Sequence, residues 1–423
     1  MRYLQILLFF VLSTAGALAQ KFTDTELLGG SETLVSYGMD TTSNWWAITQ
    51  PFTDRYRLTV NGVQSDVYEE LNVPVFSPDG ESWAALGVRD SQWHIIVEGE
   101  EIPLSYNTAE ELQYSADSRI LSMVGYRGSE PWIIGYEIES DEGTGKIRLR
   151  TVGTPLPLVR KSGKYFMSNN GRRRAYVGER SGGKVISIEG KESLVYDDIM
   201  PVGFWYDGRF IYGARLGGQW RLYRNEEELT GGFSGFGEPV INMAGTIAAF
   251  VGSYQTGSVV VVISDDYYEP RIGEQYEKVM NLTLHPTLAM YAYNAVDQAK
   301  PLVVYNGARY AATFTSSPPR FTWSGDNLVY MICEIECSLS IDGKQFPLKT
   351  SFDLSRPFVV DPVTNTFAYV SSASLAVRKY TSDYVSSGMI VDEMSPVRYN
   401  RRNHAYEMLG RINQRLYMVR CLM

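Results

Sequence analysis

Short apolar stretches recur along the chain, and each of them follows a polar turn. The segment "VFSPDGESWAALGVRDSQWHIIVEG" (75–99) has an apolar start, a Ser-Pro-Asp-Gly turn, a Trp-Ala-Ala-Leu run and a second run that ends in Glu-Gly. Gly, Asn and Asp tolerate the positive φ that tight hairpins require. The pattern therefore predicts antiparallel β-strands joined by hairpins, and segments of helical period are essentially absent.

The same pattern occurs ten times. Successive repeats begin 36 to 41 residues apart, except for one step of 54 residues between Ile120 and Arg174. A second strand follows after a polar gap and usually ends in Asn-Gly, Glu-Gly or Asp-Gly, and a weaker strand leads into the next repeat. We therefore expect three to four strands in each repeat. The first residues of the aligned strands are Trp45, Trp83, Ile120, Arg174, Phe210, Ile247, Leu288, Leu328, Phe367 and His404.

A single sheet of this size cannot bury both of its faces, so it must stack on its neighbours. For β-meanders with this period the stable arrangement is a β-propeller, in which blades pack face to face around an axis. We predict an all-β fold of about ten repeats of ~38 residues. One ring of ten blades is the first expectation. Two lobes that share strands, or a smaller ring with further units packed outside it, are the alternatives.

The two ends of the chain predict how the ring closes. The last repeat stops at "RLYMVRCLM", directly after its second strand, so its outer strand is missing. The segment "KFTDTELLGG" near the N-terminus has the character of an outer strand. If it completes the last blade, the ring is closed by the N-terminal strand and an exposed sheet edge is removed.

The long step and the N-terminus set the domain boundaries. Residues 139–153 are charged and Gly-rich, which predicts a loop or hairpin insertion. Residues 1–19 contain Arg2, a continuous apolar run and a small-x-small end before Gln20, which is typical of a signal peptide cleaved after Ala19. An uncleaved anchor helix is the alternative. We expect residues 20–423 to form one propeller that is secreted or periplasmic and, after cleavage, does not span a membrane.

Composition limits the classes of partner. The net charge of −9 argues against nucleic acid. The chain is long enough to fold without staples, and its three cysteines are few for an exported protein. Cys333 and Cys337 flank three residues of a predicted hairpin tip, so a local disulfide and two unpaired cysteines are both compatible with the sequence. The three histidines are far apart in sequence, and we expect no metal and no cofactor.

The string "FSPDGESWA" (76–84) resembles the repeat of exported bacterial TolB-type and WD-like (Pro-Asp repeat) propellers. "IDGKQFPL" (341–348) and "IEGKESLVYDDI" (188–199) resemble the ends of repeats in such proteins. The resemblance covers nearly the whole chain after residue 19, although only the second repeat is close to the consensus. It implies a propeller fold and, often, binding of a protein or ligand, and it transfers no catalytic residue.

A search for catalytic chemistry gives no candidate catalytic residue. "GGFSGFG" (231–237) fails the nucleophile-elbow pattern because Phe236 stands where the second Gly is required. Phosphate loops, dinucleotide fingerprints and the His-Glu-x-x-His motif are absent from the sequence. We therefore expect a monomeric, non-enzymatic binding or scaffold module for a protein or small ligand, with ligand-binding residues unassigned. The alternative is a propeller enzyme, a glycan hydrolase or lyase, with carboxylates that converge near the axis.

Three groups of residues are weaker candidates for a binding surface. Acidic residues gather at predicted turns and would form an acidic rim, or simply a solvated surface. Arginines gather at two equivalent turns and would favour an anionic ligand if they shared one face. Three tryptophans occupy one repeat position and suit either packing between blades or an aromatic ligand face. The groups are Glu98, Glu100, Glu101, Glu226, Glu227, Glu228, Asp265 and Asp266; Arg172, Arg173, Arg174, Arg401 and Arg402; and Trp93, Trp132 and Trp220.

Overall fold

The computed structural model describes residues 21–140, 146–158, 161–265, 269–322, 324–348, 358–361, 363–371, 373–380, 384–386 and 388–423. The predicted signal peptide (1–19) and the tip of the predicted insertion (141–145) lie outside these residues. All regular secondary structure in these residues is β-strand. They contain no helix that is long and apolar enough to cross a membrane.

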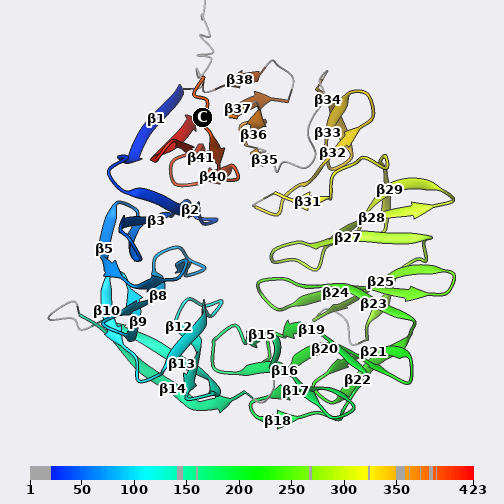
Figure 1. Ribbon diagram of the computed structural model, residues 1–423. Helices are drawn as coiled ribbons and strands as arrows, with labels where there is room; N and C mark the ends of the chain where they lie inside the picture. Colours follow the sequence, from blue (N-terminus) through cyan, green and yellow to red (C-terminus); the bar gives the residue numbers. More distant parts are fainter. Residues whose placement is uncertain are drawn as a thin grey trace, which may run out of the picture.

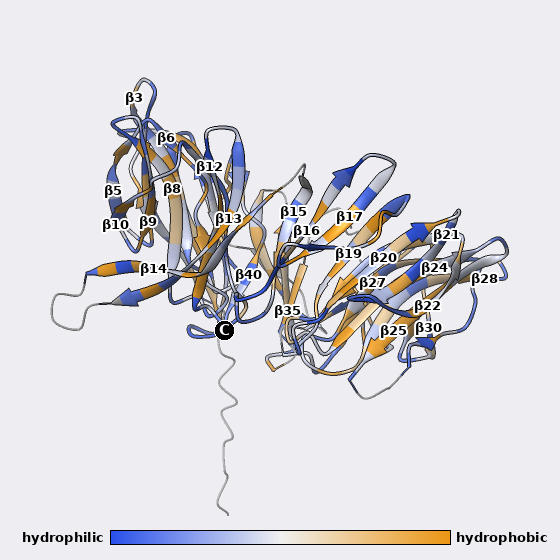
Figure 2. Ribbon diagram, turned by 90° about the horizontal axis from the view of Figure 1, so that it is seen from below, coloured by the Kyte–Doolittle hydropathy of each residue, from blue (hydrophilic) through white to orange (hydrophobic). Residues whose placement is uncertain are grey.

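Ten small antiparallel sheets form one closed ring, so the prediction of a ten-bladed β-propeller is confirmed (Figure 1). Strands follow one another as meanders, and the first strand of each blade lies toward the centre of the ring while the last lies at the rim (Figure 1). Hydrophobic residues concentrate along the strands and hydrophilic residues in the hairpins (Figure 2). We number the blades 1 to 10 in chain order.

Blade 1 contains β2 (Thr33–Met39), β3 (Trp45–Phe52), β4 (Arg55–Val60) and β5 (Val63–Tyr68), and blade 2 contains β6 (Glu70–Leu71), β7 (Val75–Phe76), β8 (Trp83–Arg89), β9 (Gln92–Val97) and β10 (Glu100–Pro103). Blade 3 contains β11 (Thr108–Tyr114), β12 (Ile120–Arg127), β13 (Glu130–Ser140) and β14 (Ile147–Pro157), and blade 4 contains β15 (Lys161–Met167), β16 (Arg174–Arg180), β17 (Gly183–Ile188) and β18 (Lys191–Glu192). Blade 5 contains β19 (Asp198–Phe204), β20 (Phe210–Leu216), β21 (Gln219–Arg224) and β22 (Glu227–Phe233).

Blade 6 contains β23 (Gly235–Ile241), β24 (Ile247–Tyr254), β25 (Gly257–Ser264) and β26 (Arg271–Ile272), and blade 7 contains β27 (Lys278–Leu284), β28 (Tyr291–Asp297), β29 (Lys300–Tyr305) and β30 (Ala308–Ala311). Blade 8 contains β31 (Arg320–Phe321), β32 (Leu328–Cys333), β33 (Cys337–Ile341) and β34 (Lys344–Pro347), and blade 9 contains β35 (Phe358–Asp361), β36 (Thr366–Ser371), β37 (Ser374–Lys379) and β38 (Tyr384–Ser386). Blade 10 contains β39 (Glu393–Met394), β40 (Arg398–Asn400), β41 (Ala405–Ile412), β42 (Arg415–Leu422) and β1 (Lys21–Leu28).

The ring is closed by β1, as the chain ends predict. β1 pairs antiparallel with β42 at seven positions, from Lys21 opposite Leu422 to Leu28 opposite Leu416. Leu27 and Leu28 pack against a cluster shared by blades 10 and 1, and Phe22 packs against the cluster between blades 9 and 10. The first strand in the sequence therefore belongs to the last blade.

The hydrophobic core lies between the blades. Each of ten clusters of buried residues among the described part of the chain draws on two neighbouring sheets. Between blades 5 and 6, for example, Trp220 and Leu222 of β21 pack with Phe236 of β23 and Phe250 of β24. This arrangement removes from water the apolar faces that a lone sheet would expose, which stabilises the ring.

Seven of the ten aligned residues begin strands in the structure, Phe367 and His404 are each one residue from a strand start, and β28 begins at Tyr291, three residues after Leu288. The alignment was three residues early in this blade, because the turn from His285 N to Met290 O (2.9 Å) has the same length as the turn from Ser77 N to Ser82 O (2.8 Å), so Tyr291 is the counterpart of Trp83. Within this turn, His285 Nδ1 accepts hydrogen bonds from the Thr287 and Leu288 backbone amides (3.1 and 2.9 Å). At the step of 54 residues, β13 and β14 form a long hairpin that projects from the ring (Figure 2).

The loops that join the first to the second strand, and the third to the fourth strand, lie on one side of each meander. We call this side the turn face. Hydrogen bonds between its first loops link blades 1 to 6 in succession. They join Asn44 Nδ2 to Gly80 O (2.8 Å), Asp79 N to Ser118 Oγ (3.2 Å), Asp117 N to Asn169 O (3.0 Å), Arg173 Nη1 to Gly208 O, and Tyr206 N to Gly245 O (2.9 Å).

Candidate ligand-binding cavities on the turn face

The residue after the third strand has the same structural role in six blades. It has a positive φ, and its side-chain oxygen accepts a hydrogen bond from the first backbone amide of the second strand. Glu98, for example, accepts from Trp83 N at 2.5 Å with φ 51°. The equivalent residues are Asn61, Glu189, Asn225, Asn306 and Asp342. A carboxylate or amide side chain is thus needed at this position to accept the hydrogen bond from the first backbone amide of the second strand.

The predicted acidic rim is therefore mostly engaged. Glu98 is a backbone acceptor, and Glu101 accepts hydrogen bonds from Tyr68 Oη (2.5 Å) and Arg89 Nη1 (2.8 Å). Glu226, Glu227 and Glu228 form ion pairs with Lys191, Arg224 and Arg221. Glu100 is exposed, and Asp266 lies outside the described residues. These contacts give most of the acidic residues a structural partner rather than a shared cation site.

The three repeated tryptophans lie between blades. Trp220 is 7% exposed within the cluster of blades 5 and 6, and its ring stacks on Phe236 with centroids 5.6 Å apart. Trp93 and Trp132 pack, partly buried, against the cluster of blades 2 and 3. These positions favour packing between blades over an aromatic ligand face.

The arginines separate into different environments. Arg172 is exposed, whereas Arg174 is 3% exposed and donates to the carbonyls of Ile133 and Thr154 across blades 3 and 4. Arg173 and Arg402 each line a cavity, and both belong to loops of the turn face. The structure thus places one arginine of each cluster beside a cavity on the same face.

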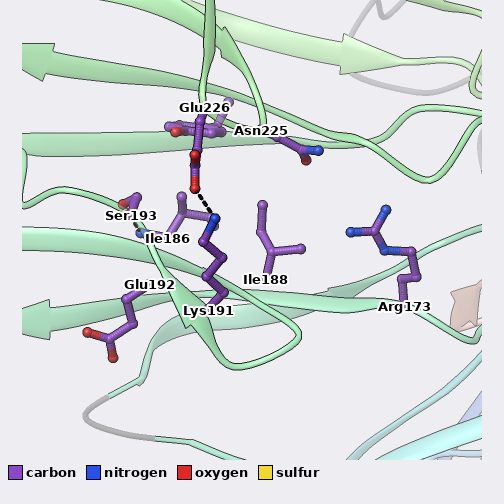
Figure 3. Close-up of a pocket in the computed structure, with 9 residues that line it drawn as sticks. Arg173, Ile186, Ile188, Lys191, Glu192, Ser193, Asn225 and Glu226 are labelled. Atoms are coloured by element: carbon purple, nitrogen blue, oxygen red, sulfur yellow. Dashed lines mark hydrogen bonds and ion pairs between the residues drawn. The ribbon is translucent and has the colours of Figure 1, made fainter.

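The cavity between blades 4 and 5 has a volume of about 310 Å³ (Figure 3). Its apolar wall is formed by Ile186 and Ile188 of β17. Lys191 of β18 and Glu226 of the next blade form an ion pair of 2.6 Å, and Figure 3 shows Ile188 between this pair and the Arg173 side chain. A volume of this size lies at the lower end of the range for small-ligand sites.

Tyr212 gives this cavity a buried polar group. The side chain is fully buried and lies against Tyr196, with ring centroids 6.3 Å apart. Burial is the main cause that raises the pKa of Tyr212, and hydrogen bonding with the Tyr196 phenol adds to it. Tyr212 is therefore a neutral phenol at physiological pH.

The surroundings of Tyr212 differ from those of its counterparts in blades 4 and 8. Tyr176 and Tyr330 occupy the same third position of the second strand in blades 4 and 8, and their hydroxyls donate to Pro157 O (3.2 Å) and Ala311 O (3.1 Å) at the ends of the preceding outer strands, β14 and β30. The outer strand that precedes Tyr212 is β18, which is only two residues long. After β18 the chain continues beside β17 as an irregular segment, in which Ser193 N donates to Ile186 O and Tyr196 N to Lys184 O (both 2.9 Å), and Lys191, Glu192 and Ser193 line the cavity.

Among the described residues, one cation of the cavity has no carboxylate partner. Lys191 is paired with Glu226, and Glu192 accepts a hydrogen bond from Arg180 Nε (3.1 Å). Arg173 donates to the Gly208 carbonyl, and the described residues offer it no carboxylate partner. The site therefore combines an apolar wall, a free cation and a buried hydroxyl.

Two further cavities lie at blade boundaries. The one between blades 1 and 2 (about 350 Å³) is lined by Trp83, Glu98 and Arg402 among others, and burial raises the pKa of Glu98. The other lies between blades 10 and 1 (about 560 Å³) and contains Tyr37 and the Glu393–Arg411 ion pair of 3.2 Å. Burial, with the Glu393 charge, raises the pKa of Tyr37 to about 12.

Groups suited to metal binding or glycan hydrolysis do not gather in the described residues. No three His, Cys, Asp or Glu side chains lie together in a way that would hold a metal ion within those ranges. Two carboxylates on inner strands are engaged: Glu110 with the Tyr126 hydroxyl, and Glu238 with the Leu282 backbone amide (3.0 Å). Residues 231–237 join β22 to β23, so they do not form a strand–turn–helix elbow.

Cys333 and Cys337 form a disulfide in the structure, and Ile335 between them is 93% exposed. Cys421 is a buried free thiol, and burial raises its pKa to about 12. The sequence argument did not find Tyr212, Lys191 or Ile186 as site residues.

The fold defines the chain as a ten-bladed β-propeller. No family model matches the chain, and no curated protein matches it. Similar solved structures include the β-propeller domain of the Trilobed protease from Pyrococcus furiosus (13% identity, 67% of this chain and 96% of that chain, TM-score 0.33). TolB from Acinetobacter baumannii (13%, 77% and 78%, TM-score 0.27) and a eukaryotic initiation factor (12%, 75% and 88%, TM-score 0.44) are also similar. TolB-type and other propellers are thus among its structural neighbours, and these similarities do not bear on its function.

Proposed function

We propose that this chain is a non-enzymatic binding module, and that the cavity between blades 4 and 5 is its ligand site. The observation that carries the proposal is the lining of this cavity, which combines the apolar side chain of Ile188 with the Arg173 guanidinium, for which the described residues offer no carboxylate partner. The cavity admits a small molecule or a single side chain of a protein partner, because its volume is about 310 Å³.

Two blades form the site, and both are held rigidly. Arg173 and Gly208 are hydrogen-bonded across the boundary, and Phe204, Phe210, Tyr212 and Ile186 share one buried cluster. A preorganised site of this kind binds without a large ordering cost. No described contact supports the glycan-active alternative, which requires convergent carboxylates near the axis.

A ligand screen with a cavity-filling variant tests this function. A library of small metabolites is screened against the chain by thermal shift, and hits are measured by calorimetry. Ile188→Phe fills the apolar wall, and Val63→Phe makes the same change in the cavity between blades 1 and 2. We expect hits that Ile188→Phe weakens and Val63→Phe does not.

Two results contradict the proposal. Hits that bind both variants as tightly as the unmodified chain place the site elsewhere. Chemical conversion of a hit during incubation, detected by mass spectrometry, shows that the chain is an enzyme.

We also propose that residues 1–19 are removed on export. The pairing of Cys333 with Cys337 supports an oxidising compartment, and the apolar run before Ala19 has the composition of a signal peptide. Mass spectrometry of the protein expressed in a secretion-competent bacterial host is expected to find Gln20 at the N-terminus. Retention of the apolar run would favour the anchor alternative.

A further inference from the structure

We infer that the cavity between blades 4 and 5 selects a monocarboxylate, with its carboxylate on Arg173 and its apolar part on Ile186 and Ile188. The inference rests on the proposed binding function and names the ligand class. Both a free small acid and an acidic side chain of a peptide carry this chemistry.

The charges of the lining favour a single negative charge. The Lys191–Glu226 pair and the contact of Glu192 with Arg180 leave Arg173 as the cation without a carboxylate partner among the described residues. A guanidinium has five N–H donors, and the Gly208 carbonyl uses only one of its nitrogens. One carboxylate therefore neutralises the site, whereas a dianion would add repulsion from Glu226 and Glu192.

The rest of the lining requires an apolar group that also carries an acceptor. Ile188 is half-buried and offers an apolar surface next to the buried Ile186. Asn225 uses its Oδ1 to accept from Phe210 N (2.8 Å), which leaves its amide nitrogen as a further donor. Figure 3 shows Asn225 and Arg173 on the same side of the Lys191–Glu226 pair.

The volume of the cavity limits the size of the ligand. About 310 Å³ corresponds to roughly ten water volumes of ~30 Å³ each. An acylated branched amino acid combines one carboxylate, a branched alkyl group and amide acceptors within that volume. N-acetyl-leucine is therefore a suitable probe, and N-acetyl-leucinamide is its uncharged match.

The experiment compares these two probes by calorimetry and adds acetyl-Val-Asp-Leu-amide as the peptide arm. We expect N-acetyl-leucine to bind at least tenfold more tightly than the amide, and the affinity to fall with ionic strength. Arg173→Met should weaken the acid by about tenfold or more, since hydrogen bonds to charged groups are of that strength. Arg172→Met, at the exposed neighbouring position, should leave the affinity unchanged.

A second variant tests the apolar wall without removing charge. Ile188→Phe should weaken both N-acetyl-leucine and its amide by a similar factor, while the preference for the acid is retained. Melting curves identify variants that fail to fold. If acetyl-Val-Asp-Leu-amide binds and N-acetyl-leucine does not, the carboxylate is an acidic side chain of a protein partner.

The outcomes distinguish a failure of the carboxylate inference from a failure of the proposed binding function. If neutral or cationic library hits compete with each other for the cavity and acids do not bind, the carboxylate inference is overturned and the binding function stands. An amide that binds as tightly as the acid, or an unchanged affinity in Arg173→Met, also overturns the inference. If the whole library and all probes fail to bind, both proposals fail.

Discussion

Glu407 of β41 is fully buried in the blade that closes the ring, and its Oε1 accepts a hydrogen bond of 2.5 Å from Arg420 Nε on the adjacent strand β42. Asn400 Nδ2 donates to the other oxygen at 3.0 Å. Glu407 is opposite Arg420 on one side and opposite Arg398 of β40 on the other. A buried carboxylate is thus held by three strands of the closing blade.

We expect the two partners of this pair to be unequal in their effect on stability. Arg420→Met leaves the Glu407 carboxylate buried, with the cost of an uncompensated charge, so it should lower the free energy of unfolding by about 3 kcal/mol or more. Glu407→Leu should cost less, because the Arg420 side chain is 32% exposed and turns toward water. The double variant should recover part of the loss in urea denaturation. Equal losses in the two single variants would contradict this account.

Removal of the closing strand should destabilise the whole ring. A chain that begins at Ser31 lacks β1, which covers the edge of β42 at seven positions and partly buries Phe22, Leu27 and Leu28. Partial burial of three such side chains predicts a loss of at least about 3 kcal/mol. The exposed edge also favours aggregation.

The matched control for this deletion is a chain that begins at Lys21, which keeps β1. Calorimetry should show an unchanged melting temperature for the control and a clearly lower one for the chain without β1. An unchanged melting temperature for both would mean that β1 does not close the ring in solution.

The stability of the chain should decrease in mild acid through His285. Burial lowers the pKa of His285 below its ordinary value of 6.5, while the Gly325 backbone and the Asp326 charge act in the opposite direction. As the pH falls below about 6.5, the unfolded state takes up a proton before the folded state does, so the free energy of unfolding decreases. Urea denaturation at pH 7, 6 and 5 measures this decrease.

His285→Asn is the comparison for this pH dependence. Asn242 occupies the same turn position in blade 6, where its Oδ1 accepts from the Thr246 and Ile247 amides. Asparagine therefore preserves the acceptor and removes the titration. The variant should lose less stability between pH 7 and pH 5 than the unmodified chain, and an equal loss would assign the pH dependence to other groups.

Reduction of the Cys333–Cys337 disulfide should have a small effect. The bond closes a loop with a sequence separation of only four residues, for which chain entropy predicts about 2 kcal/mol. A melting temperature a few degrees lower in Cys333→Ser/Cys337→Ser would agree with this value. Cys421 should stay unreactive toward thiol reagents in the folded chain, because it is buried and its pKa is raised to about 12. Rapid labelling of Cys421 would contradict the buried position.

The repeat period predicted the blades and made one ring of ten blades the first expectation, and the two chain ends predicted that the N-terminal strand closes the ring. Trp45, Trp83 and Phe210 begin strands where the alignment places them. Leu288 does not, because the turn from His285 to Met290 is the counterpart of the turn from Ser77 to Ser82, so the strand begins at Tyr291. Apolar residues on both sides of the true start made the two alignments equivalent in the apolar pattern.

The sequence by itself determined that this chain is a ring of thin antiparallel sheets, since each repeat has too little apolar surface to be stable alone. It did not determine the candidate site. Arg173 was already one member of an arginine cluster, but only the packing of blade 4 on blade 5 places it beside Tyr212, Ile186 and Lys191. The physical reason is that the cavity lies between two blades, so its lining comes from β17, β18 and the following blade, which only the packing of neighbouring blades brings together.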